Sequence, residues 1–203
     1  MTLYALKPRF QGLLRPLVAR LASGGVTANQ VTLLAAAGSL VIAALVVWKA
    51  EHRILFLLLP IWFLVRMALN AIDGMLAREF GQKSRLGAYL NELCDVVSDA
   101  ALYLPFAFVA PFSSLGVGVA VFLSALTEFA GILGPTVEAS RRYDGPLGKS
   151  DRALAFGALG LWVGVGAPLP DWMSWFFPLI NVFLIITVVN RVRAGLREAA
   201  SAG

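Results

Sequence analysis

The sequence predicts an all-α fold: an integral membrane bundle of six transmembrane helices with an N-terminal amphipathic interfacial helix. Three observations lead to this fold class. Of the 203 residues, 59% are apolar and only 14% are charged, and six apolar segments alternate with short polar breaks. A soluble domain has about 25% charged residues, and one membrane span needs about 20 apolar residues. The composition therefore excludes a disordered chain and argues against a soluble domain.

The first 25 residues predict a helix that lies on the membrane surface. Its arginines interrupt any long apolar run, so we expect neither a span nor a cleavable signal peptide here. Apolar side chains nevertheless share one helical face, namely Phe10, Leu13, Leu14, Leu17, Val18 and Leu21. This pattern is typical of an interfacial helix. A frayed basic tail is the alternative.

Residues 29–190 predict the six-helix bundle. The expected spans are Asn29–Trp48, Ile54–Arg78, Leu86–Ala110, Ser113–Val137, Arg152–Ala167 and Trp172–Asn190. Thr27 is a candidate N-cap of the first span, and the breaks contain turn residues such as Pro111 and Pro168. Residues 191–203 are expected to form a cytoplasmic tail, within a single domain over residues 1–203.

Basic residues are concentrated at one end of this predicted bundle. With the N-terminus on side one, only Lys49 and Arg53 fall on side two, and Arg66 lies inside the second span. The other fourteen of the 17 cations fall on side one: Lys7, Arg9, Arg15, Arg20, Arg78, Lys83, Arg85, Arg141, Arg142, Lys149, Arg152, Arg191, Arg193 and Arg197. Cytoplasmic segments carry such an excess. We therefore expect a multi-pass inner membrane protein with both termini and the active site cytoplasmic, and no nucleic acid partner.

Polar residues inside the predicted spans are the candidate functional residues, because a membrane interior tolerates them poorly. Two stripes at helical spacing are Arg66, Asn70, Asp73 and Ala77 on the second span, and Gly87, Asn91, Asp95 and Asp99 on the third, with Glu92 at its edge. Facing each other, they predict an acidic cleft open to the cytosol, with the oxygen ligands that Mg²⁺ prefers. Internal salt bridges, for example from Arg66 to Asp73 or Asp95, are the alternative. One buried arginine, however, does not balance four acids.

The segment from Asn70 to Asp95 resembles the signature of the CDP-alcohol phosphotransferases, D-x2-D-G-x2-A-R-x8-G-x3-D-x3-D. All spacings match over 26 residues, and six of the eight signature residues are identical: Asp73, Gly74, Ala77, Arg78, Gly87 and Asp95. Residues 26–32 are also similar to the family's usual entry into its first helix. The resemblance implies six membrane helices and a cytosolic active site.

The resemblance also implies an activity. The family transfers a phosphoalcohol group from a CDP-linked donor, often CDP-diacylglycerol, to an acceptor hydroxyl, and releases CMP in phospholipid synthesis. Its motif aspartates hold divalent ions, Mg²⁺ or Mn²⁺, and the last aspartate is the proposed base. Asp95 is then the candidate base, and Asp73 and Asp99 are further candidate catalytic residues. The candidate nucleotide-binding residues are Gly74, Ala77, Arg78, Gly87 and Arg66, although close helix packing alone also explains such glycines.

This chain departs from the family at two positions, because Asn70 and Asn91 stand where the signature has aspartate. An asparagine oxygen binds a metal without contributing charge. Three outcomes stay open. One ion suffices, or Glu92 and Asp99 replace the missing acids and two ions bind, or the site only binds a CDP-lipid. The candidate metal ligands are Asn70, Asp73, Asn91, Asp95, Glu92 and Asp99.

The acceptor is an alcohol or a phosphorylated polyol. Residues 141–152 carry four cations, of which Lys149 and Arg152 are the best candidates for a phosphate contact, although topology alone also explains a basic loop. Membrane lipids are expected partners, and a homodimer is a candidate assembly because dimers are usual in the family. The rival functions are a non-catalytic CDP-lipid-binding protein or partner subunit, and a small transporter.

Overall fold

The structure, a computed structural model, describes residues 3–202, all of them in helices or their connections. Seven α-helices follow one another along the chain: α1 (Leu3–Ser23), α2 (Ala28–Trp48), α3 (Leu58–Glu79), α4 (Arg85–Tyr103), α5 (Ser114–Ile132), α6 (Lys149–Gly164) and α7 (Phe176–Ala202). Short 3₁₀ helices lie between them: η1 (Arg53–Leu57), η2 (Leu104–Phe108), η3 (Gly134–Val137) and η4 (Asp171–Trp175). The predicted all-α fold is confirmed.

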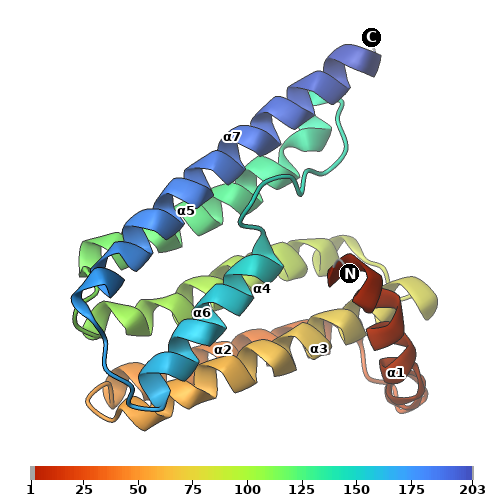
Figure 1. The fold of residues 1–203 in the computed structure, drawn as a ribbon. Helices are drawn as coiled ribbons and strands as arrows, with labels where there is room; N and C mark the ends of the chain where they lie inside the picture. Colours follow the sequence, from red (N-terminus) through yellow and green to blue (C-terminus); the bar gives the residue numbers. More distant parts are fainter. Residues whose placement is uncertain (1–2, 203) are drawn as a thin grey trace.

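The helices α2 to α7 run alongside one another, and consecutive helices point in opposite directions (Figure 1). The α1–α2 turn, the α3–α4 turn, the α5–α6 connection and the C-terminus all lie at one end of the bundle. The segments that carry the fourteen cations of side one therefore share that end. The predicted alternation of the connections is confirmed by this arrangement.

Four helical stretches in the described part of the chain are long and apolar enough to cross a membrane: Ala28–Trp48, Arg53–Glu79, Ser114–Ile132 and Asp171–Ser201. Two of the six expected spans do not reach this standard. The helix α4 carries Arg85, Glu92, Asp95 and Asp99, and α6 has only 16 residues. Composition and length thus support four spans.

The helix ends follow local chemistry. Thr27 caps α2 as predicted: its hydroxyl accepts from Gln30 N at 3.2 Å, and Gln30 Oε1 accepts from Thr27 N at 2.9 Å. The helix α4 ends before the predicted Ala110 because Pro105 cannot donate to the helix, and the chain continues as η2. The helix α7 extends through the predicted tail to Ala202.

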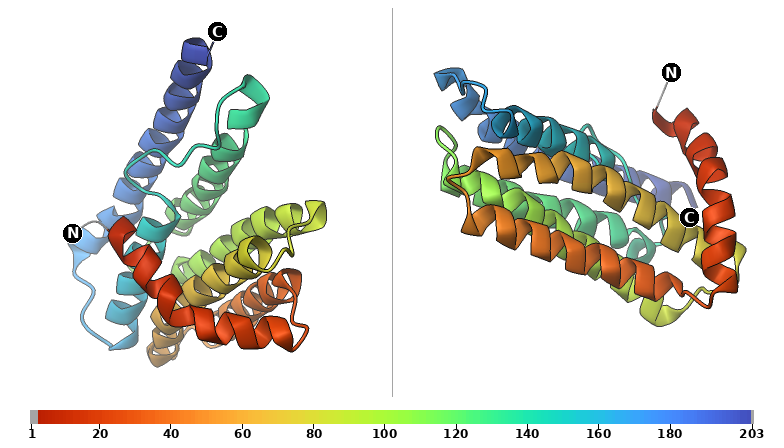
Figure 2. Two further views of the ribbon diagram at one scale, coloured as in Figure 1. Left: turned by 90° about the vertical axis from the view of Figure 1, so that its right-hand side faces the viewer. Right: turned by 90° about the horizontal axis from the view of Figure 1, so that it is seen from below.

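The helix α1 lies across the end of the bundle where the cations gather (Figure 2). Its predicted apolar face is divided. Val18 is buried, and Leu14 and Leu21 pack beside it against Ile72 and Met75 of α3, whereas Leu13 and Leu17 are exposed. The prediction that this stretch is helical is supported for residues 3–23. Residues 1 and 2 and Gly203 lie outside the described part of the chain.

The largest apolar cluster fills the opposite half of the bundle, around stacked aromatic rings. The rings of Tyr103 and Phe156 stack with their centroids 3.7 Å apart, and Phe106 and Phe177 complete the group. The buried charged side chains lie outside this aromatic group, toward the half of the bundle near α1. The short helix α6 spans both halves, so its position determines how Lys149 and Arg152 meet the other helices.

Glycines bring α6 against η1 and α3. A Cβ atom on Gly164 would lie 2.7 Å from the backbone nitrogen of Leu57, and one on Gly160 would lie 3.2 Å from the carbonyl oxygen of Phe56. Small residues at helix contacts let backbones approach in this way.

We predict that Gly164→Ala destabilises the protein by about 1–3 kcal/mol, because a backbone atom must move to admit the methyl group. Gly118 of α5 is the matched control, since a Cβ there would meet nothing within 4 Å. Gly118→Ala should leave stability within about 1 kcal/mol of the parent. Thermal unfolding of both purified variants in detergent measures the difference, and equal melting temperatures would contradict this packing.

Candidate active site

The polar stripes of α3 and α4 face each other, as the helical spacing predicts. Asn70 Nδ2 donates to Asp95 Oδ1 at 3.2 Å, and Arg66 Nη2 donates to Asp95 Oδ1 and to the Asp95 carbonyl oxygen at 3.1 Å each. Asn70 and Arg66 are one turn apart, so both reach the same carboxylate. These contacts fix the side chain of Asp95 between the two helices.

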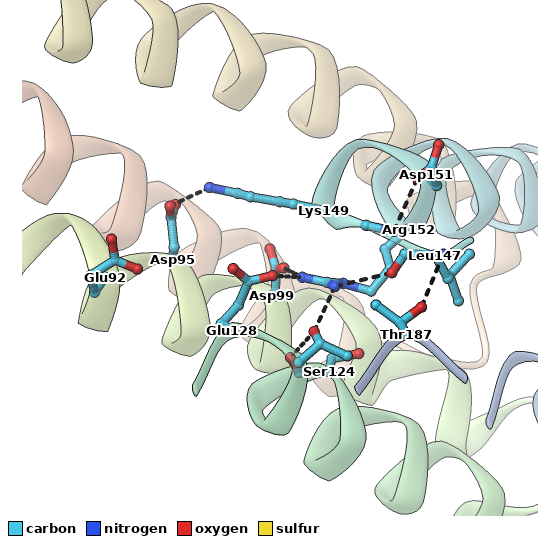
Figure 3. Close-up of polar contacts among 12 residues, drawn as sticks. Glu92, Asp95, Asp99, Ser124, Glu128, Leu147, Lys149, Asp151, Arg152 and Thr187 are labelled. Carbon is cyan, nitrogen blue, oxygen red and sulfur yellow. Dashed lines mark hydrogen bonds and ion pairs between the residues drawn. The ribbon is translucent and has the colours of Figure 1, made fainter. Parts of the chain in front are cut away.

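Asp95 also forms an ion pair with a third helix. Lys149, the first residue of α6, places its Nζ against Asp95 Oδ2 (Figure 3). The side chains of Asp95 and Lys149 keep 18% and 33% of their exposure, so this pair lies at the mouth of the site. The predicted importance of Lys149 is thus matched by its position.

Asp73 lies on α3 one turn after Asn70, and its side chain is buried. Its Oδ2 accepts a hydrogen bond from Thr32 Oγ1 of α2 at 2.8 Å. Since Asn70 precedes Asp73 by one turn, the two side chains share one face of α3. Thr32 escaped prediction because a threonine in an apolar helix carries no distinctive signal.

Asp99 is buried between two arginines. Arg66 Nη1 pairs with its Oδ1, and Arg152 Nη2 lies 3.2 Å from its Oδ2. Arg152 is fully buried, and its guanidinium also donates to Thr127 Oγ1 at 3.0 Å and Glu128 Oε1 at 2.8 Å (Figure 3). In this arrangement Nη1 and Nη2 of Arg152 are hydrogen-bonded to protein groups.

Glu92 also has an arginine partner. Both of its carboxylate oxygens accept from the guanidinium of Arg141, which belongs to the α5–α6 connection. The expectation that a single buried arginine faces these acids is wrong, because Arg66, Arg152 and Arg191 are all buried and Arg141 is half-buried. Internal salt bridges, the alternative interpretation, therefore account for Glu92 and Asp99, and the suggested pair of Arg66 with Asp95 is present as well.

The α5–α6 connection is held in place by its own ion pairs. Arg142 contacts Asp144 at 2.9 and 3.1 Å and pairs with Glu198 of α7, whose carboxylate also accepts from Ser140 N at 2.9 Å. The hydrogen bonds from Arg142 hold the pKa of the Asp144 carboxyl below its ordinary value. The loop is thereby anchored on both sides of Arg141.

The remaining signature residues lie on the same two helices, toward the end of the bundle where the cations gather. A Cβ on Gly74 would lie 2.8 Å from Arg78 Nη2, so the exposed Arg78 guanidinium covers this glycine. A Cβ on Gly87 would lie 2.8 Å from Asn29 Oδ1 of α2, which supports close packing as a role for Gly87. Ala77 and Asn91 are half-buried.

The donor set suits a divalent ion that is completed by substrate. Asp73 and Asp95 offer carboxylates, and Asn70 keeps its carbonyl oxygen free of the contact that its Nδ2 makes with Asp95. Within residues 3–202, no three His, Cys, Asp or Glu side chains are arranged to hold an ion by themselves. Mg²⁺ is typically bound by one or two carboxylates plus substrate phosphates, so these residues fit one such ion.

This chain is similar to several known proteins. The inner membrane protein YnbA of Escherichia coli (strain K12) is 50% identical over 203 residues, covering 98% of this chain and 99% of YnbA. A phosphatidylinositol phosphate synthase of Mycobacteroides abscessus is 30% identical over 121 residues, covering 59% of this chain and 53% of the synthase.

Two crystal structures of the Mycobacterium tuberculosis phosphatidylinositol phosphate synthase PgsA1 share the fold. The complex with manganese and citrate has a TM-score of 0.72 at 22% identity and covers 89% of this chain and 88% of that one. The structure with CDP-DAG bound has a TM-score of 0.70 at 21% identity, over 89% and 92%. The family model of the CDP-alcohol phosphatidyltransferases matches residues 25–192, so the chain belongs to that family.

Proposed function

We propose that this chain transfers the phosphatidyl group of CDP-diacylglycerol to an alcohol acceptor at the cytoplasmic face of the inner membrane. The observation that carries the proposal is the pair of facing stripes, in which Asp73 and Asp95 keep the signature positions on α3 and α4. Family membership makes the chain a membrane transferase of phospholipid biosynthesis. The CDP-DAG-bound relative supports the choice of donor.

We infer that all six helices α2 to α7 cross the membrane. The helix α4 packs between α2 and α5, and α6 packs on α3, so the charges of α4 point into the bundle rather than toward lipid. The excess of cations at one end supports a cytoplasmic location for that end. The helix α1 then lies in the membrane interface, with Leu13 and Leu17 toward lipid.

The reaction is a displacement at phosphorus. The acceptor hydroxyl oxygen attacks the phosphorus that carries diacylglycerol and forms a new P–O bond. The P–O bond to CMP breaks, and CMP leaves with the bonding electron pair. Asp95 accepts the hydroxyl proton, while Arg66 and Asn70 hold its carboxylate in position. Lys149 lies beside the same carboxylate and is placed to attract the diphosphate.

One divalent ion matches the charge of this site. The family signature has four aspartates, whereas this chain keeps two, and two carboxylates balance one divalent cation. Glu92 and Asp99 pair with arginines, but Asp95 also pairs with Arg66 and Lys149. The choice of Asp73 and Asp95 as ligands therefore rests on their match to the family signature. A divalent ion held by Asp73 and Asp95 would neutralise charge that develops on the leaving group.

We predict that Asp73→Asn and Asp95→Asn each lower CMP release from CDP-diacylglycerol by about 100-fold or more, because each removes a ligand or the base. The assay uses purified full-length protein with a panel of acceptor alcohols. Asp171→Asn, at the exposed start of η4, is the control and should keep full activity. Full activity in either site variant would exclude this function, and donor binding without turnover in the parent would favour the non-catalytic alternative.

We predict one bound Mn²⁺ per chain in the presence of CDP, measured by titration with electron paramagnetic resonance. Asp73→Asn should abolish this binding. Glu92→Gln and Asp99→Asn should leave the stoichiometry at one, since both side chains pair with arginines. Two ions in the parent that fall to one in either variant would instead establish the replacement-acid site.

We predict that the cysteine of Lys83→Cys reacts only with reagents that reach the cytoplasm. The cysteine of Glu51→Cys should react only from the opposite side of the membrane. Cys94→Ala provides the background, because it removes the chain's single cysteine. Labelling of both positions from one side would contradict an odd number of spans between them.

A further inference from the structure

Three arginines from three separate segments converge on one buried carboxylate, Glu128 of α5. Arg152 Nη2 lies 2.8 Å from Glu128 Oε1, Arg191 Nη1 lies 3.6 Å from the same oxygen, and Arg141 Nη2 lies 3.8 Å from Oε2. Arg152 and Arg191 are 0% and 2% exposed, and Glu128 is 8% exposed. The reaction proposed above uses none of these four groups, which we call the Glu128 cluster.

Such a convergence of guanidinium groups is the usual protein site for a phosphate monoester. Here the carboxylate of Glu128 takes the position among the three guanidinium groups that a phosphate would occupy. Each of the three arginines also has further polar protein partners: Arg141 pairs with Glu92, Arg152 with Asp99, and Arg191 with the Thr127 carbonyl oxygen. Each guanidinium of the cluster therefore has anionic or carbonyl partners within the protein, although the buried Nε atoms of Arg141 and Arg152 have no hydrogen-bond partner.

The acids of the surrounding network are all paired. Four arginines face four acids, Arg66, Arg141, Arg152 and Arg191 against Glu92, Asp95, Asp99 and Glu128, and Lys149 adds a fifth cation at Asp95. A phosphate dianion beside buried Glu128 would add like charge in a medium of low dielectric, where repulsion is strong.

The Glu128 cluster borders the place where the acceptor must lie. Asp99 is one helical turn, about 6 Å, beyond the proposed base Asp95, and it shares Arg152 with Glu128. Glu92 is one turn before Asp95, and the Arg141–Glu92 pair retains 31% and 24% exposure. An acceptor whose hydroxyl reaches Asp95 thus has this network of ion pairs as its neighbour.

We propose that the acceptor of this chain is an alcohol that carries no phosphate group, and that Glu128 determines this specificity by occupying the anion position among Arg141, Arg152 and Arg191. The proposal rests on the phosphatidyl transfer proposed above. The sequence leaves two acceptor classes open, an alcohol and a phosphorylated polyol. The proposal selects the unphosphorylated alcohol. The relatives called phosphatidylinositol phosphate synthase are named for a phosphorylated product, in contrast to the acceptor without phosphate that we propose here.

The test compares matched pairs of small molecules on the purified full-length protein. Binding of inorganic phosphate, glycerol 3-phosphate and inositol 1-phosphate is measured by calorimetry, and CMP release is measured with each phosphorylated compound against glycerol and myo-inositol. We expect the parent to bind none of the three anions saturably. We expect Glu128→Gln to gain phosphate binding by at least about tenfold, because it frees the cluster of its anion.

Glu92→Gln is the second variant, because it releases only the half-exposed Arg141 and disturbs the buried core less than Glu128→Gln. It should also gain phosphate binding, a change that a purely structural role for the acid would not produce. The control is Arg193→Gln with Arg197→Gln. These exposed arginines line a separate open pocket with Asn190 of α7 and Asp144 of the α5–α6 connection.

The outcomes separate this proposal from the function on which it rests. Saturable phosphate binding by the parent overturns the proposal if Arg141→Gln abolishes it and the control pair keeps it. Preferential CMP release with a phosphorylated acceptor overturns it as well. If the parent releases no CMP with any acceptor, yet phosphate binding appears only in the two acid variants, the transfer function fails and the assignment of the anion position stands.

Discussion

The pairing of buried arginines with acids across helices is the constraint on which the rest of this structure depends, while buried Asp73 instead accepts a hydrogen bond from Thr32. A membrane bundle has little water to solvate an ion, so an unpaired carboxylate inside it is costly. Asp99 and Glu128 are kept only because Arg66 and Arg152 reach them from neighbouring helices. These ion pairs join α3, α4, α5 and α6, and Arg191 adds α7. The same contacts that neutralise the interior therefore fix how the helices meet.

The site follows from this arrangement, because its side chains sit at the exposed edge of the paired network. Asp95 is held by Arg66 and Asn70 on one side and meets Lys149 on the other. Lys149 arrives there because glycines let α6 approach η1 and α3 closely. A change in the packing of α6 far from the chemistry thus moves a cation of the site.

Helical periodicity was sufficient to predict the two facing stripes, the Thr27 cap and the position of most helices, because these depend on residues near one another in sequence. It could not predict which cations reach which acids. Arg141 and Arg191 were explained by topology alone, yet both point into the bundle and contact Glu128. Pairing across helices depends on rotation and depth in three dimensions. The continuation of α7 to Ala202 was missed for a related reason, since residues beyond a span carry no apolar signal.

One hydrogen bond of Asn70 bears on why this chain has an amide where the family signature has an aspartate. The amide of Asn70 donates to Asp95 at 3.2 Å, which an ionised aspartate cannot do. An aspartate at position 70 would bring two carboxylates to that separation, and their repulsion would be relieved only by a cation between them. Asparagine keeps the shape of the side chain and replaces this cation with a hydrogen bond. The change from acid to amide at position 70 is therefore compatible with the same fold and the same nucleotide signature.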